Sequence, residues 1–150
     1  MIDEAIHIQV IGLMPDVPIE LKATRISAGT KMFKLQSFAK FIADENGTVD
    51  LKIAKPTEGT YLEVDAMGLF WSLERKEEVQ DDNQAITDKL APHKLMISLH
   101  IQNEVVDELE IIRLWKAPHI EREDVREGGL VGTFFYHDLK EKKPGVIVLG

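Results

Sequence analysis

The chain has 150 residues, 44% hydrophobic and 29% charged, a composition ordinary for one soluble globular domain with a core of its own. Its 26 acidic and 18 basic residues give a net charge of −8 without a basic stripe, so a nucleic-acid partner is not expected. The chain lacks cysteine, a signal peptide and any apolar run approaching the roughly 20 residues of a membrane span, so we expect a cytoplasmic protein without disulfides or a membrane partner.

Three stretches in the first half alternate apolar and polar residues, the pattern of half-buried strands. They are residues 6–10, 19–26 and 31–44, and segments with proline or glycine separate them. In the longest stretch one face is expected to turn toward the core. That face carries Phe33, Leu35, Ser37, Ala39, Phe41 and Ala43.

Residues 44–47, Asp-Glu-Asn-Gly, are typical of a tight hairpin turn, because Asn46-Gly47 tolerates positive φ angles. Val49, Leu51 and Ile53 then alternate, and we predict that they return along a partner strand. The same stretch weakly resembles a calcium loop. Its glycine comes too early and the distal glutamate is absent, so we interpret it as a turn.

Further strands are predicted at 60–64, 93–102 and 108–115, and no helical periodicity is convincing. About seven short strands with turns between them indicate an all-β fold, an antiparallel β-sandwich. Two polar stretches interrupt the pattern. Residues 74–92 are interpreted as a strand-poor surface excursion with a short helix around 86–90, and residues 117–128 as a charged connector.

Two more strands are predicted beyond the connector, Leu-Val-Gly-Thr-Phe-Phe-Tyr-His at 130–137 and Gly-Val-Ile-Val-Leu at 145–149. The unbroken apolar run of the second strand is typical of a strand buried on both faces. We therefore divide the chain into a sandwich domain (1–116), the connector and the start of another domain (129–150). Without a sheet of their own, the terminal strands are expected to pair with each other, with a sandwich edge or with a second molecule.

A catalytic constellation is not evident. None of the four serines lies in a Gly-x-Ser-x-Gly elbow, and the five histidines do not stand at metal-ligand spacing. Gly128, Gly129 and Gly132 stand before or at the start of a predicted strand, whereas a phosphate cradle would open a helix. We therefore expect no catalytic residue, metal ligand or cofactor site in the chain.

One apolar cluster, residues 65–71 (Asp-Ala-Met-Gly-Leu-Phe-Trp), follows neither the period of a strand nor that of a helix. It is either a loop that closes one end of the core or a docking surface, since exposed clusters with Trp and Met mark interfaces. The two interpretations are compatible. The candidate contact residues are Asp65, Met67, Gly68, Leu69, Phe70 and Trp71.

Two spaced motifs, in this order, resemble a known family. Residues 37–51 follow S-x-A-x-F-x-A-D…G-x-V-D-L, and residues 59–72 follow G-x-Y…D-x-M-G-L-x-W-S. The opening Gly-Leu-Met-Pro at 12–15 is also in keeping. The chain is similar in these motifs to the N-terminal domain of the acyl-CoA thioesterase and bile acid-CoA:amino acid N-acyltransferase family. It departs from the family where Tyr-Leu-Glu-Val stands in place of a usual glycine-bearing segment, and in the size of Phe38.

This resemblance implies an immunoglobulin-like sandwich in front of an α/β-hydrolase domain. The Cys or Ser nucleophile, the Asp and the His of that domain would lie beyond residue 150, and residues 129–150 would be its first strands. The terminal Gly-Val-Ile-Val-Leu-Gly would then lead into the loop that supplies an oxyanion-hole amide. Acyl-CoA would be a substrate of the full-length protein only, and this part alone would be inactive.

The expected role is therefore to pack against the hydrolase domain through residues 65–71 and to help shape its site. A free-standing immunoglobulin-like binding module is the alternative. It would need a row of exposed aromatic side chains, which Trp71 and Trp115 do not offer. A stand-alone enzyme would need the constellation that the serines and histidines do not form.

Overall fold

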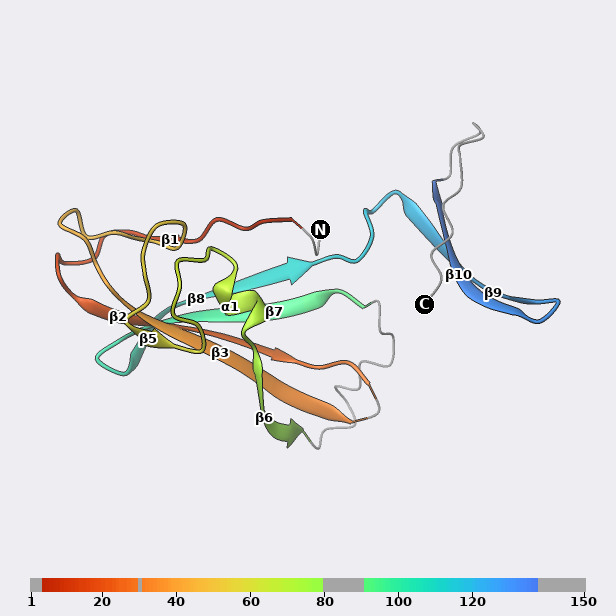
Figure 1. The fold of residues 1–150 in the computed structure, drawn as a ribbon, viewed down its shortest axis with the longest axis horizontal. Coiled ribbons are helices and arrows are strands. Elements are labelled where there is room, and N and C mark those ends of the chain that lie inside the picture. Colours follow the sequence, from red (N-terminus) through yellow and green to blue (C-terminus); the bar gives the residue numbers. More distant parts are fainter. Residues whose placement is uncertain (1–3, 30, 80–90, 138–150) are drawn as a thin grey trace. The chain divides into compact units, whose positions relative to one another are not determined.

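The computed structural model of the chain describes residues 4–29, 31–79 and 91–137, and in this part nearly all regular structure is β-strand (Figure 1). The chain separates into two compact units, Met1–Trp115 and Lys116–Gly150. Each unit is described by itself below. Within the described ranges, no helix is both long enough and apolar enough to span a membrane.

The first unit is built on one large antiparallel sheet. Its strands run in the order β5-β3-β2-β7-β8, and β6 also pairs with β3. The bounds are β2 (Pro18–Ile26), β3 (Met32–Ile42), β5 (Glu58–Gly59), β6 (Glu74–Val79), β7 (His93–Ile101) and β8 (Glu104–Arg113). The strands predicted at 19–26, 31–44 and 93–102 are thus confirmed as β2, β3 and β7, and each of them has one buried face.

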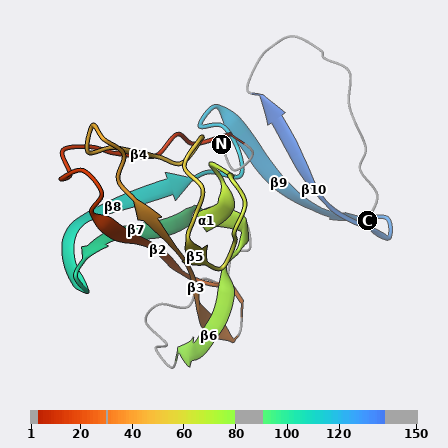
Figure 2. The same cartoon turned by 60° about the vertical axis from the view of Figure 1, so that its left-hand side comes forward.

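A small second layer covers one face of this sheet. It consists of β1 (Gln9–Val10) and β4 (Val49–Asp50), which pair antiparallel, together with the loops beside them (Figures 1 and 2). The predicted all-β antiparallel sandwich is confirmed. Its two layers are unequal, since the covering layer contains only short strands.

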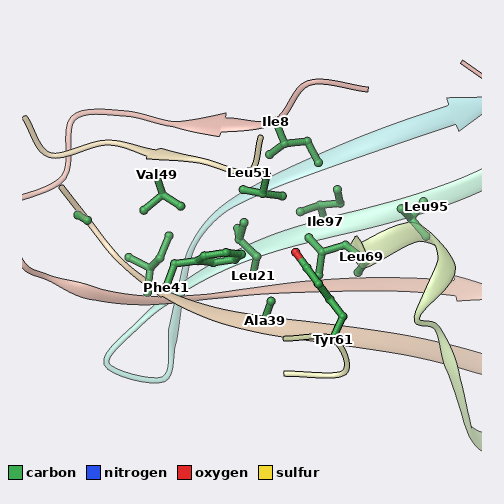
Figure 3. Packing of buried hydrophobic residues seen from close by; sticks show 13 residues of the cluster. Ile8, Leu21, Ala39, Phe41, Val49, Leu51, Tyr61, Leu69, Leu95 and Ile97 are labelled. Carbon is green, nitrogen blue, oxygen red and sulfur yellow. The ribbon is translucent and has the colours of Figure 1, made fainter. Parts of the chain in front are cut away.

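The core lies between the two layers, where apolar side chains of the main sheet meet those of the cover (Figure 3). The sheet contributes Leu21, Ala39, Phe41, Leu95 and Ile97; the cover contributes Ile8, Val49, Leu51, Tyr61 and Leu69. Full burial of one such aliphatic or aromatic side chain stabilises the fold by about 1.5–3 kcal/mol. The cover therefore stays in place chiefly through its side chains, because its own strand pairing is short.

The chain passes from the main sheet to the cover through the turn at 44–47. The turn is confirmed: the amide of Gly47 donates to the Asp44 carbonyl (2.9 Å), and Gly47 has a φ of 70°. The hairpin predicted around it is wrong, because β4 pairs with β1 and not with β3. One edge of β3 is occupied by β2 and the other by β5 and β6, so no edge is left for a returning strand.

Two other sequence predictions differ from the structure of the first unit. Residues 74–79, predicted to belong to a strand-poor excursion, form β6, and the strand predicted at 60–64 is absent while β5 lies just before it. Strand β6 is mostly exposed on both faces, so its sequence shows no alternation. The helix predicted around 86–90 falls outside the described residues.

The second unit contains an antiparallel hairpin of β9 (Ile120–Glu127) and β10 (Leu130–His137). Residues 120–127, which the sequence analysis assigns to a charged connector, form strand β9 and pair with β10 along their whole length. The predicted strand at 130–137 is confirmed. Several apolar side chains of β10 are exposed, namely Val131, Phe134, Phe135 and Tyr136. The strand predicted at 145–149 lies outside the described residues.

Replacement of Gly47 by alanine tests the turn that joins the layers. A Cβ atom at Gly47 would lie 2.0 Å from the carbonyl oxygen of Leu13, and its φ angle is positive. We expect Gly47→Ala to lower the free energy of unfolding by about 3 kcal/mol or more, from backbone strain and this overlap. Urea denaturation measures the change.

Gly12→Ala is the matched control, because Gly12 also has a positive φ (78°) while its Cβ would meet nothing within 4 Å. The control should lose only about 1 kcal/mol, the strain alone. Equal losses in the two variants would contradict the role given to the Leu13 contact.

Candidate functional site

The candidate contact residues lie on a single helical turn, α1 (Gly68–Trp71), and on the loop that leads into it. Figure 2 shows this turn beside the strands of the main sheet. One buried hydrogen bond attaches the turn to β3: the hydroxyl of Ser37 donates to the carbonyl oxygen of Leu69 over 2.5 Å. The Leu69 side chain is fully buried in the core. The turn thus closes the core at this position.

Gly68 allows the turn to approach the ring of Tyr61. A Cβ atom at Gly68 would lie 2.2 Å from Cε2 of Tyr61, a separation that packed atoms do not reach. The Tyr61 ring is itself buried and belongs to the core (Figure 3). Its hydroxyl is buried too, and no described residue forms a hydrogen bond with it. Burial, assisted by the nearby Asp65 carboxylate, raises the pKa of Tyr61 to about 12.

Asp65 organises the outer side of the turn. One carboxylate oxygen accepts a hydrogen bond from the Met67 amide (2.7 Å), and the other accepts one from the indole Nε1 of Trp71 (2.7 Å). The indole remains 63% exposed. Asp65 therefore holds a large aromatic side chain at the surface in a defined orientation, two residues after buried Leu69 on the same turn.

Further contacts tie the segment to three parts of the first unit. Thr60 bridges it to β3, since its amide donates to the Phe38 carbonyl (2.9 Å) and its hydroxyl lies 2.7 Å from that of Ser72. The sulfur of Met67 accepts a hydrogen bond from the Ile6 amide (3.3 Å). The guanidinium of Arg113, on β8, lies 5.2 Å from the centre of the Phe70 ring. The turn is thereby a rigid part of the unit.

The structure brings all six candidate residues together, but their exposure differs. Gly68 and Leu69 are buried, while Asp65, Met67 and Phe70 are half-buried and Trp71 is exposed. The surface available to a partner is consequently Trp71 with the outer parts of its neighbours. That a partner domain binds there remains a prediction.

Sequence reasoning missed the residues that support this turn, namely Ser37, Thr60, Tyr61 and Ser72. A signal for three of them was present, because Ser37, Tyr61 and Ser72 belong to the two spaced motifs that carry the family resemblance. In the structure these motifs meet, because Ser37 of the first binds Leu69 of the second, and within the second motif Tyr61 packs on Gly68. The motifs therefore encode the packing of one turn on one sheet.

The described residues do not assemble hydrolytic or metal chemistry. Ser98 and His100 form a pair on β7, with Oγ and Nε2 2.9 Å apart. The carboxylate nearest in the strand register belongs to Glu20, which is paired with Lys22 (2.6 Å), so it does not orient the imidazole as a triad would require. No group of three or more His, Asp or Glu side chains in the described part of the chain is arranged to hold a metal.

Comparison with known proteins gives one family. Residues 3–127 match the family described as "Acyl-CoA thioester hydrolase/BAAT N-terminal region". This range contains both spaced motifs, the turn at residues 65–71 and residues 3–115 of the first unit.

Individual relatives agree with the family match. The chain is 32% identical to human bile acid-CoA:amino acid N-acyltransferase over 99% of its own length and 37% of the relative's. It is 32% identical to rat acyl-coenzyme A amino acid N-acyltransferase 2 (98% and 36% of the two lengths). It is 28% identical to human acyl-coenzyme A thioesterase 1 (97% and 35%). The chain thus spans little more than a third of the length of these relatives.

Gly68→Ala tests the contact with the Tyr61 ring. Gly68 does not have a positive φ, so alanine would ordinarily suit this helical position. Because of the overlap with Tyr61, we expect the variant instead to lose about 1–3 kcal/mol of stability by urea denaturation. In a Tyr61→Leu background the same substitution should cost clearly less. An undiminished cost in that background would contradict the proposed contact.

Tyr61→Phe tests the buried hydroxyl through pH. A pKa raised from 10 to about 12 means that folding favours the protonated phenol, so its contribution is complete below pH 10 and is lost as pH rises toward 12. The wild type should therefore lose about 1–2 kcal/mol more stability than Tyr61→Phe over this range. Near pH 7 Tyr61→Phe should be at least as stable as the wild type, since it removes a buried hydroxyl that has no partner among the described residues. Parallel pH profiles would contradict this assignment.

Proposed function

The chain belongs to the acyl-CoA thioester hydrolase/BAAT N-terminal family, and from that premise we propose that it is the non-catalytic N-terminal domain of an enzyme acting on acyl-CoA thioesters. The observation that carries the proposal is the family match together with the length of the relatives, of which the chain spans about 37%.

The chemistry of the complete enzyme follows from its substrate class. A nucleophile in the following α/β-hydrolase domain attacks the carbonyl carbon of the thioester. The carbon–sulfur bond then breaks, CoA departs as its protonated thiol, and the acyl group stays on the nucleophile as an acyl-enzyme. Water then releases a carboxylic acid, or the amine of an amino acid takes the acyl group. Both outcomes fit the names of the relatives, which include a thioesterase and N-acyltransferases.

The contribution of this domain is to pack against the hydrolase domain through residues 65–71 and to help shape its site. Trp71 supports this role, because an exposed indole fixed by Asp65 loses little conformational freedom when a partner covers it. The exposed aromatic residues of β10 support a neighbour for the second unit as well.

Location and self-association are also proposals. A cytosolic setting is supported by the complete absence of cysteine. Self-association through the terminal strands is supported by the exposed apolar side chains of β10, a strand paired within the described residues only with β9.

Hydrogen exchange tests the proposed contact in the protein as its native source produces it. The amides of residues 65–71 and the Trp71 indole N–H should exchange at least about tenfold more slowly in the native protein than in the 150-residue chain. Equal exchange would contradict a contact at this surface. A native mass equal to the 17.0 kDa of this chain would instead favour a free-standing binding module.

Trp71→Ala in the native protein tests the effect on activity. We expect the rate of acyl-CoA thioester cleavage, measured with and without an amino acid acceptor, to fall about tenfold, since a central aromatic anchor carries much of an interface. Trp115→Ala is the control, because Trp115 is also partly exposed but lies outside the segment. Equal rates in the two variants would contradict the role of Trp71.

A further inference from the structure

A second candidate binding surface lies at the edge of the main sheet that β8 forms. Within the described residues β8 pairs only with β7, so the sheet ends at β8 on this side. The other side of the strand leaves backbone N–H and C=O groups available to a further strand. Because β8 is 10 residues long, this open edge is long enough to seat a whole partner strand.

The covering layer stops short of β8, so the sandwich is open along this edge. Leu109 stands opposite Ile97 in the register of β7 and β8, which places both side chains on one face of the sheet. Ile97 is buried in the core, whereas Leu109 is 56% exposed, and no buried core residue of the described chain lies on β8. A cavity of about 230 Å³ is lined by these two residues and, from the covering layer, by Ile8 and Val10. The apolar interior therefore reaches the surface beside β8.

Strand β8 also carries large apolar side chains that are exposed to solvent. Four of them are more than half exposed, namely Val105, Val106, Leu109 and Ile112. Strand β6, at another edge of the same sheet, has charged residues of both signs from Glu74 to Glu78 and no exposed large apolar side chain. Natural proteins protect a free edge with charge, as β6 does, whereas exposed apolar clusters mark surfaces that a partner covers. The apolar side chains of β8 therefore favour a partner.

The charge on β8 is almost all of one sign. Within the described ranges none of its four acidic residues takes part in an ion pair, and they are Glu104, Asp107, Glu108 and Glu110. The one basic residue, Arg113, ends the strand and donates a hydrogen bond to the Glu4 carbonyl oxygen (2.9 Å). Glu108 and Glu110 flank Leu109 in the strand, so they project from the opposite face of the sheet. One edge thus presents an apolar side chain on one face and two carboxylates on the other.

These charges decide which kind of strand can pair with β8. Pairing with the β8 strand of a second copy would bring acidic side chains next to one another, which is unfavourable. A strand with lysine or arginine on one face and apolar side chains on the other complements both faces of β8.

We propose that the free edge of β8 binds an extended peptide segment of a partner protein, in which basic and apolar side chains alternate. The segment adds one strand to the main sheet through backbone hydrogen bonds. Its apolar side chains lie beside Leu109 and cover the cavity, and its basic side chains lie beside Glu108 and Glu110. This binding does not depend on the activity proposed above.

Fluorescence anisotropy of a labelled peptide, titrated with the 150-residue chain, tests the surface. The probe is Lys-Val-Lys-Ile-Lys-Val-Lys with blocked ends, whose lysines share one face when it is extended. At an ionic strength of about 0.15 M, which screens long-range attraction, we expect saturable binding with a dissociation constant of about 1 mM or below. The peptide Lys-Lys-Val-Ile-Val-Lys-Lys, of equal composition without the alternation, should bind at least about tenfold more weakly. Equal binding of the two peptides, or no binding, would overturn the proposal.

Two variants locate the binding site. Glu108→Lys should weaken binding of the alternating peptide about tenfold or more, because it replaces an attraction by a repulsion. Glu78→Lys, the same charge change at an exposed position on β6, should leave binding unchanged. Thermal melts establish that each variant is folded. Unchanged binding in folded Glu108→Lys, or an equal loss in Glu78→Lys, would overturn the proposal.

Hydrogen exchange of the wild type separates strand addition from contact of side chains alone. When the alternating peptide saturates the chain, the β8 amides that point away from β7 should exchange at least about tenfold more slowly. Unchanged exchange throughout β8 would overturn the proposal.

Discussion

The hydrogen bond between the Ser37 hydroxyl and the Leu69 carbonyl joins the main sheet of the first unit to the helical turn α1. Ser37 lies in the middle of β3, and Leu69 lies on a helical turn that is only four residues long. A turn of this length has almost no stability of its own. Its position depends on the buried hydrogen bond and on the burial of Leu69, and the orientation of Trp71 depends on its position.

The residues behind the family resemblance have mechanical roles in this structure. Gly68 makes room for the Tyr61 ring, Asp65 orients Trp71, and Gly47 passes over the Leu13 carbonyl. None of them is arranged as a nucleophile, a base or a metal ligand in the described part of the chain. A motif of this type specifies how a domain packs.

The sequence predicted strands that carry an apolar pattern and failed for strands that carry none. Alternation located β2, β3 and β7, whereas β6 and β9 are mostly exposed, charged strands without a hydrophobic pattern. The turn at Gly47 was recognised from local chemistry. Its partner strand was not, because pairing depends on which sheet edges are free, and that is decided by residues distant in sequence. The candidate turn was found as an apolar cluster, but its supports at Ser37 and Tyr61 lie up to 32 positions away.

The placement of Leu69 and Trp71 on the same turn links the interior of the domain to its surface. The indole cannot shift far without moving a fully buried leucine, and a loosened core would release the indole. Binding of a partner at this surface would therefore be thermodynamically linked to the folding of the domain. A partner that immobilises Trp71 raises the melting temperature of the sandwich, and a substitution deep in the core weakens the partner's affinity without touching it.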